Sequence, residues 1–304
     1  MLRNIALLIV LCFAAPAGVL AAPSSRAVEA PGLSSDPAAD RFLTLDGPAI
    51  RYRDEGPRRA PVIILIHGFT FSLESWDAWA ADLARDHRVL RYDLAGHGLS
   101  AADPAGRYAT VDREAQLGAL MKRLGISKAT IAGNSLGGMI AWNFAADHPK
   151  QVEKLILVDT GAFSINGVHD TPVAVPPMMR SFLMSPTAAG MAFTASRIYA
   201  HPDRVPPATL ERLHAMMARN GPAMIAHLER FTLPDPVAKL GTIKAPTLIL
   251  WGERDTFIPL ADATRIGDAI PGSAVAIVPD AGHAPQEEAP AESLARVRAF
   301  LSQH

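Results

Sequence analysis

The residue with the strongest chemical signature is Ser135, which lies in the sequence GNSLG at residues 133–137. An apolar, β-branched run precedes it, and apolar residues at helical spacing follow it. A serine at a strand-to-helix turn forms a nucleophile elbow. Small neighbours let adjacent backbone pass, and the free N–H groups of the helix N-terminus face a developing oxyanion. The motif and its position together predict that Ser135 is a nucleophile.

A serine hydroxyl needs a general base, and an imidazole base needs an acceptor for its second N–H group. His283 lies in DAGHAP, residues 280–285, directly after the last predicted strand. Asp255 ends the sequence WGERD, residues 251–255, after the strand before it. The carboxyl ends of parallel strands present their loops at one edge of a sheet, where these side chains can meet. The chain order Ser135, Asp255, His283 therefore predicts a catalytic triad.

Other polar residues have competing interpretations. Asp159 also follows a buried run and is an alternative triad acid, whereas Glu253 is expected to face solvent. His67 and His97 lie in glycine-flanked loops, where a side chain can bond to backbone, so both are interpreted as structural. Three further histidines, whose spacing fits no metal-binding motif, are His201, His214 and His227.

An oxyanion hole needs two backbone donors. The residue after the nucleophile, Leu136, provides one N–H group. The second is assigned to Phe69, in the loop HGFT at residues 67–70 that follows an early buried run. We expect both amides to face the carbonyl oxygen of the substrate.

The elements that hold these residues alternate between strands and helices. Eight segments have strand patterns: residues 42–45, 50–52, 62–66, 89–92, 129–132, 155–158, 247–251 and 274–278. Apolar residues recur at helical spacing in 76–83, 117–124, 136–144 and 294–301. This alternation demands an α/β fold, with a mostly parallel eight-stranded sheet and helices on both faces.

One stretch, residues 163–235, has no buried-strand pattern and is expected to form an inserted helical cap. Loops are expected at its prolines, which are Pro172, Pro176, Pro177, Pro202, Pro206, Pro207 and Pro222. Methionines in the cap either line an adaptable apolar pocket or pack the cap onto the core. The flanking segments, residues 41–162 and 236–304, are assigned to the α/β core.

Residues 1–22 have the features of a secretion signal: a basic start at Arg3, an apolar stretch, and small residues near Ala21. Residues 23–40 are rich in Pro, Ala and Ser and are expected to be a linker. We expect export to the periplasm or the medium, without stable membrane insertion after cleavage; an uncleaved N-terminal anchor is the alternative. The one cysteine, Cys12, lies in the signal, so the mature chain is expected to form no disulfide.

Composition narrows the classes of partner. The 29 Lys and Arg nearly balance the 30 Asp and Glu, and they form no basic stripe, so nucleic acid is not an expected partner. Hydrophobic residues make up 49% of the chain, which is enough for a large core. The expected partner is a small molecule with an apolar acyl group. Nothing in the sequence specifies an oligomeric state.

Together these motifs resemble the α/β-hydrolase superfamily over residues ~42–302. In the family's order they are HGF at 67–69, DLAGHGLS at 93–100, GNSLGG at 133–138, WGERD at 251–255 and GH at 282–283. The sequence is most similar to the capped subgroup of meta-cleavage-product hydrolases, enol-lactonases and small esterases. Dehalogenases and epoxide hydrolases of the superfamily carry Asp at the nucleophile, so Ser135 argues against both.

The resemblance implies a serine hydrolase that cleaves a carboxylic ester or a lactone through an acyl-enzyme on Ser135. His283 would deprotonate the serine, protonate the leaving group and then activate water. No cofactor or metal is implied. Two alternatives use the same residues, a carbon–carbon bond hydrolase of vinylogous diketones and an acyltransferase. A third alternative is a non-catalytic ligand receptor on the same fold.

Overall fold

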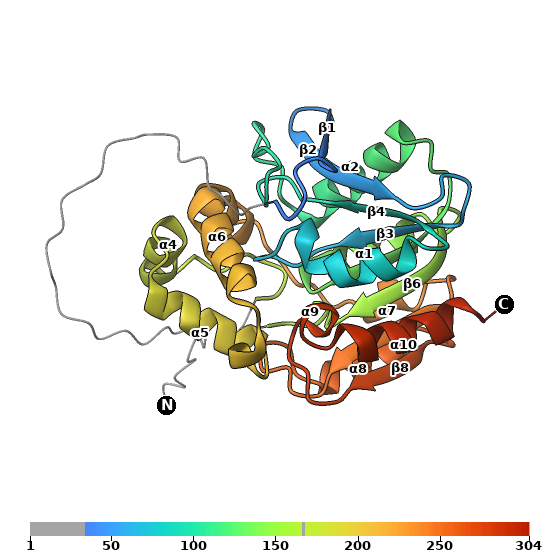
Figure 1. The fold of residues 1–304 in the computed structure, drawn as a ribbon. Helices are drawn as coiled ribbons and strands as arrows, with labels where there is room; N and C mark the ends of the chain where they lie inside the picture. Colours follow the sequence, from blue (N-terminus) through green and yellow to red (C-terminus); the bar gives the residue numbers. More distant parts are fainter. Residues whose placement is uncertain (1–33, 166–167, 304) are drawn as a thin grey trace, which may run out of the picture.

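A computed structural model describes residues 34–165 and 168–303 and contains one eight-stranded sheet (Figure 1). The strands are β1 (Arg41–Thr44), β2 (Ala49–Glu55), β3 (Val62–Ile66), β4 (Arg88–Tyr92), β5 (Ala129–Asn134), β6 (Val152–Val158), β7 (Thr247–Gly252) and β8 (Ala274–Val278). Their order is β1-β2-β4-β3-β5-β6-β7-β8. β2 pairs antiparallel with β1 and β4, and all other pairs are parallel. The predicted α/β fold class is confirmed.

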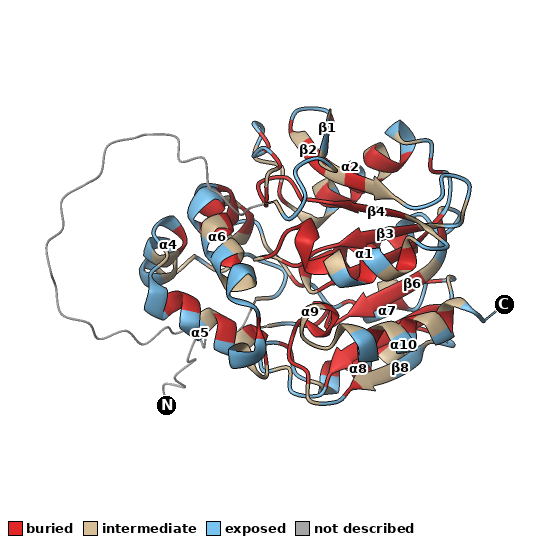
Figure 2. Ribbon diagram, in the orientation of Figure 1, coloured by how far each residue is buried: buried red, intermediate tan, exposed pale blue. Residues whose placement is uncertain are grey.

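Helices cover both faces of the sheet. The core helices are η1 (Leu73–Trp76), α1 (Asp77–Leu83), α2 (Thr110–Arg123), α3 (Leu136–Asp147), α7 (Val237–Leu240), α8 (Ala261–Ala269), α9 (Pro285–Glu288) and α10 (Pro290–Leu301). Trp79 of α1 and Val297 of α10 belong to the apolar cluster on one face. Leu120 of α2, Phe144 of α3 and Ile266 of α8 belong to the cluster on the other face. The central strands, β3 to β7, are mostly buried between these layers, whereas the edge strands β1 and β8 are largely exposed or half-buried (Figure 2).

Between β6 and β7 the chain forms a group of helices beyond the carboxyl ends of the strands (Figure 1). They are α4 (Pro177–Met184), α5 (Ala188–Ile198), η2 (Pro202–Arg204) and α6 (Pro207–Leu228). Their buried side chains, among them Met217 and Met224, share an apolar cluster with Phe71 and Ala284 of the core. Part of the methionine set therefore packs these helices onto the sheet domain.

The expectation of loops at the prolines of this region is wrong in part. Pro222 lies inside α6, and Pro177, Pro202 and Pro207 each begin a helix. Proline fits the first helical position because a backbone N–H at that position has no acceptor within the helix, so its absence costs nothing. The helix continues through Pro222, where its backbone packs closely against the end of α4. A β-carbon on the adjacent Gly221 would lie only 2.2 Å from the carbonyl oxygen of Leu183.

The predicted linker is tied to the sheet domain over its last residues. The Arg53 guanidinium of β2 donates to the Ser34 and Ser35 hydroxyls, both at 3.0 Å, and to Asp40 at 2.8 Å. Residues 34–40 therefore pack against the fold rather than span a gap. The predicted secretion signal, residues 1–22, lies outside the described residues and stays a prediction. None of the described helices combines the length and apolar character needed to cross a bilayer.

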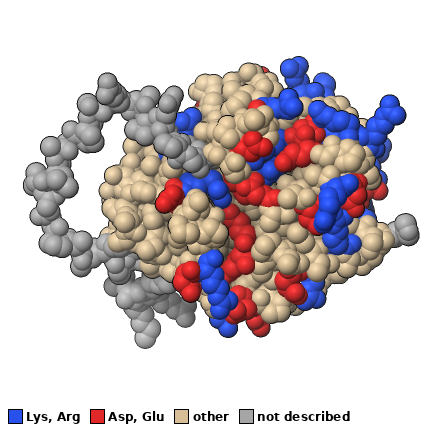
Figure 3. Space-filling model, in the orientation of Figure 1, with Lys and Arg blue, Asp and Glu red and all other residues tan. Residues whose placement is uncertain are grey.

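Figure 3 shows one face of the molecule, on which acidic and basic side chains are interspersed. On this face the surface over α4 and α5 carries few charges. Met184 of α4 and Phe193 of α5 are large hydrophobic side chains that are exposed.

Candidate active site

Ser135 occupies a sharp turn between β5 and α3. Its backbone has φ 53° and ψ −115°, a conformation that non-glycine residues rarely adopt. The turn fits only because the residues two positions before and after Ser135, Gly133 and Gly137, lack side chains. A β-carbon on Gly137 would lie 2.1 Å from the carbonyl oxygen of Ile66 on β3. The GNSLG motif thus forms the strand–turn–helix geometry of a nucleophile elbow.

His283 and Asp255 lie side by side in the loops after β8 and β7. The Nδ1–H of His283 donates to Asp255 Oδ2 at 2.8 Å, and the Asp255 side chain is fully buried. Asp255 Oδ1 accepts the backbone N–H groups of Phe257 at 2.6 Å and Ile258 at 3.0 Å. Three hydrogen-bond donors therefore face this one carboxylate. The pairing and orientation are those of a general base with its orienting acid.

The loop that carries His283 is fixed by residues for which the sequence indicated no role. The Asn134 side-chain amide donates to the carbonyl of His283 at 3.0 Å, which joins this loop to the residue before Ser135. Glu288 accepts the N–H of Gly282 at 2.7 Å and that of His201 at 2.7 Å. Asn134 stands inside the predicted motif, but no local pattern marks Glu288, because its partner His201 is distant in sequence.

The two amides assigned to the oxyanion hole lie at the same pocket as Ser135. Phe69 and Leu136 both line it, and within the described residues neither backbone N–H group donates a hydrogen bond to the protein. The loop of Phe69 is held by His67, whose Nε2 accepts the N–H of Leu94 at 3.0 Å. Burial lowers the pKa of His67 to about 4, so its imidazole is neutral and structural, as expected from the sequence.

The DLAGHGLS run after β4 has a comparable structural role. Asp93 accepts the backbone N–H groups of Leu73 and Leu99, each at 2.8 Å, and pairs with the Arg51 guanidinium at 3.1 Å. Burial raises the pKa of Asp93 to about 6. These contacts fix the loops after β3 and β4, and they explain why the DLAGHGLS motif contains an aspartate that takes no part in the triad geometry.

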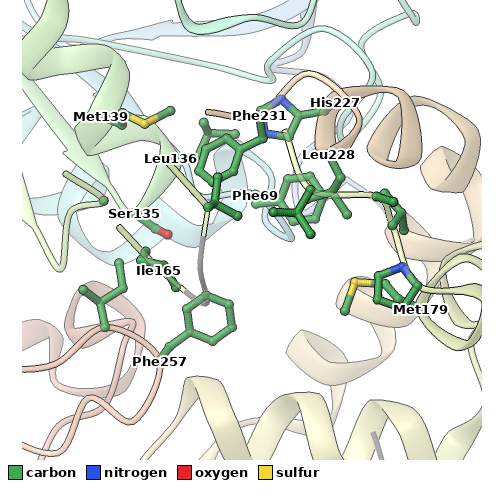
Figure 4. A pocket seen from close by; sticks show the side chains of 17 residues that line it. Phe69, Ser135, Leu136, Met139, Ile165, Met179, His227, Leu228, Phe231 and Phe257 are labelled. Atoms are coloured by element: carbon green, nitrogen blue, oxygen red, sulfur yellow. The ribbon is translucent and has the colours of Figure 1, made fainter. Parts of the chain in front are cut away.

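A mostly apolar pocket opens in front of Ser135 (Figure 4). Its volume is about 150 Å³. The lining includes Phe69, Leu136, Met139, Ile165, Met179, Leu228, Phe231 and Phe257. The Ser135 oxygen faces the space that these side chains surround. The ring of Phe257 also lies 5.0 Å from that of His283, which places the predicted base beside the same pocket.

Of the histidines His201, His214 and His227, only His227 lines this pocket. Its Nδ1–H donates to the carbonyl of Tyr108 at 3.1 Å, and its ring lies 5.2 Å from Phe69. Burial, and next the charge of Arg113, lowers the pKa of His227 to about 3. A neutral imidazole with a backbone partner agrees with the expectation of a satisfied side chain.

Asp159, the alternative acid, lies close to the triad residues. One carboxylate oxygen of Asp159, one of Asp255 and a ring nitrogen of His283 all lie within 4.8 Å of one another. The hydrogen bond of His283 is nevertheless made to Asp255. The geometry favours Asp255 as the partner of the imidazole and leaves Asp159 behind it.

Residues 61–290 match the family of the α/β-hydrolase fold, over most of the chain. The chain belongs to this family. Its fold, the family match and the relatives described next make it a hydrolase of the α/β-hydrolase type.

Characterised and solved relatives span several hydrolase activities. Lipase 1 of Psychrobacter immobilis is 25% identical, and the alignment covers 96% of this chain and 92% of the lipase. A 2-hydroxy-6-oxononadienedioate/2-hydroxy-6-oxononatrienedioate hydrolase of Klebsiella pneumoniae is 28% identical over 84% of this chain and 92% of its own. The crystal structure of the enol-lactonase from Burkholderia xenovorans LB400 superimposes with a TM-score of 0.75 at 27% identity, covering 86% and 100%.

Proposed function

We propose that the protein hydrolyses a carboxylic ester or a lactone through an acyl-enzyme on Ser135. His283 takes the hydroxyl proton as Ser135 attacks the carbonyl carbon, and the oxyanion is held by the amides of Phe69 and Leu136. His283 then gives the proton to the leaving oxygen. A water molecule, deprotonated by His283, cleaves the acyl-enzyme and restores Ser135.

One observation carries this proposal. The serine in the strained turn lines one pocket with Phe69 and Leu136, whose backbone amides have no acceptor among the described residues. The buried His283–Asp255 pair lies beside this pocket. A residue held in a sparsely allowed conformation is a common feature of active sites, because the surrounding structure must maintain it. A turn with no catalytic role would not need a strained serine, free backbone amides, a buried histidine–aspartate pair and a pocket in one place.

The pocket supports an uncharged acyl group. Among the described residues that line it, Ser135 and His227 are the only ones with polar side chains, and no Lys or Arg is present. A substrate carboxylate would enter this site without a cationic partner, which is costly. The pocket therefore favours ester or lactone hydrolysis over the diacid substrate that the Klebsiella relative's name describes.

The test is a series of p-nitrophenyl esters of increasing acyl length. A dry apolar cavity of ~150 Å³ accommodates a ligand of about six carbons, such as benzene. Each buried CH₂ contributes about 0.8 kcal/mol, or about fourfold in kcat/KM. We expect kcat/KM to rise from acetate toward hexanoate and to fall by palmitate.

Two variants make this test specific to the pocket. Leu228→Trp narrows the pocket and should move the optimum to shorter chains. Met178→Trp, at an exposed position of α4, should leave the optimum unchanged. An optimum at palmitate, or faster cleavage of a dicarboxylate substrate than of any neutral ester, would contradict the proposed substrate class.

A further inference from the structure

Asp159 is a buried carboxyl group that the proposed mechanism does not use. It follows β6, is fully buried, and has a backbone φ of 43°. Its Oδ1 accepts the backbone N–H of Gly252 at 2.9 Å. Its Oδ2 has no hydrogen-bond donor among the described residues. A buried carboxylate oxygen without a donor is costly in its ionised form.

The surroundings of Asp159 decide which of two neighbouring carboxyls carries a proton. Asp255 accepts three hydrogen bonds, two from backbone amides and one from His283. Asp159 accepts one. Two buried carboxyl groups with oxygens within 4.8 Å of each other cannot both ionise without a large cost in free energy. Burial, then the charge of Asp255 and more weakly that of Glu288, raises the pKa of Asp159 well above its usual range.

We propose that Asp159 is a positioning residue for the triad: its Oδ2 carries a proton and donates it in a hydrogen bond to the Asp255 carboxylate. This inference rests on the proposed function of Ser135. The three side chains then form a chain in which a carboxylic acid orients a carboxylate, which orients the imidazole. The proton stays on Asp159 during turnover, so a single negative charge faces His283.

Two substitutions separate this role from the alternatives, and both suit the left-handed backbone at this position. Asn tolerates φ 43° and offers an NH₂ donor to Asp255 while its oxygen keeps the bond to Gly252. Gly also tolerates the backbone but removes the donor. We expect Asp159→Asn to keep kcat within about threefold of the wild type. Asp159→Gly should lower kcat by about 10- to 100-fold, the effect of losing one hydrogen bond to a charged group, with little change in KM.

A spectroscopic measurement tests the proton directly and needs no activity. The infrared difference spectrum of wild type minus Asp159→Asn at pH 7 should contain the carbonyl stretch of a protonated carboxylic acid. The control difference, wild type minus Asp268→Asn at an exposed position of α8, should lack it. A carboxylate band in place of the acid band would overturn the proposal.

The kinetic outcomes are equally decisive. If Asp159→Asn loses as much activity as Asp255→Asn, Asp159 acts as an ionised acid and the proposal is wrong. If Asp159→Gly matches the wild type in kcat, Asp159 has no positioning role. A wild-type protein that neither turns over esters nor reacts with a fluorophosphonate at Ser135 would refute the proposed function instead. The infrared result would still report on the proton.

Discussion

Asp255 is held in a single orientation by groups from its own loop. Two backbone amides bind one oxygen, and the other oxygen receives the Nδ1–H of His283. This arrangement leaves His283 Nε2 as the unprotonated atom that can accept the serine proton. The acid therefore contributes through tautomer and orientation, and it stabilises the imidazolium that forms.

At this scale we predict that Asp255→Asn lowers kcat by about 10⁴-fold, because an amide at this position favours the wrong imidazole tautomer. Steady-state ester hydrolysis measures the loss, and circular dichroism checks that the fold is retained. A folded Asp255→Asn protein with near wild-type kcat would show that another carboxyl, with Asp159 first, orients His283.

The sequence predicts the residues of the site better than it predicts their supports. Ser135, Asp255 and His283 stand in local motifs, and each follows a strand, so motif and topology agree. Glu288 acts partly through His201, which lies far away in the chain. No local pattern identifies such a partner, because the contact exists only after the sheet and the helices α4 to α6 have come together.

The strand–turn–helix element around Ser135 depends on close backbone approach. Gly137 lies in the first turn of α3, directly against the end of β3. A β-carbon there would lie 2.1 Å from the carbonyl oxygen of Ile66 and 2.7 Å from that of His67. Both obstacles are backbone atoms, so the helix or the strand would have to move.

For this element we predict that Gly137→Ala destabilises the protein by about 3 kcal/mol, because the clash cannot be relieved by a side-chain rotation. Gly118→Ala is the matched control. It lies in α2, where the added carbon would be 3.6 Å from Phe144, and alanine favours the helix by up to about 1 kcal/mol. Urea denaturation measures both. Equal stabilities for the two variants would contradict the packing described for the elbow.

Element types follow closely from the sequence, and element ends less so. All eight predicted strands are present, because period-2 or continuous apolar runs identify strands buried in a sheet. The assignment of Pro222 to a loop is wrong, since tertiary packing of α6 outweighs the local preference of proline. The short helices α7 and α9 were not predicted, because four residues carry too little periodicity.

The junction between the sheet domain and α6 contains buried imidazoles that stay neutral. His227 of α6 contacts Phe69 and lies 3.5 Å from the Arg113 guanidinium. Burial lowers the pKa of His227 to about 3, from a usual value of 6.5, and the pKa of His97 well below 6.5. Below pH 6.5 the unfolded chain binds protons that the folded state excludes. The contribution of these buried imidazoles to the free energy of unfolding is therefore intact above pH 6.5 and is lost as the pH falls toward 3.

For the whole molecule we predict a smaller acid sensitivity in His227→Gln, in which the amide can keep the bond to Tyr108. Each excluded proton changes the free energy of unfolding by about 1.4 kcal/mol per pH unit. Between pH 7 and 5 the variant should lose about 2 kcal/mol less than the wild type. Urea denaturation at the two pH values measures this, with the exposed His214→Gln of the same helix as control. Identical losses in wild type and His227→Gln would show that His227 is not buried as a neutral group.

The most direct test of Ser135 as nucleophile is the intact mass of the protein during turnover of p-nitrophenyl butyrate. We predict a burst of p-nitrophenol and a transient mass increase of one butyryl group, mapped to Ser135. Ser135→Ala should keep its fold and show neither signal. A mass adduct on another residue, or a burst that persists in Ser135→Ala, would contradict the assignment of Ser135 as the residue that carries the acyl group.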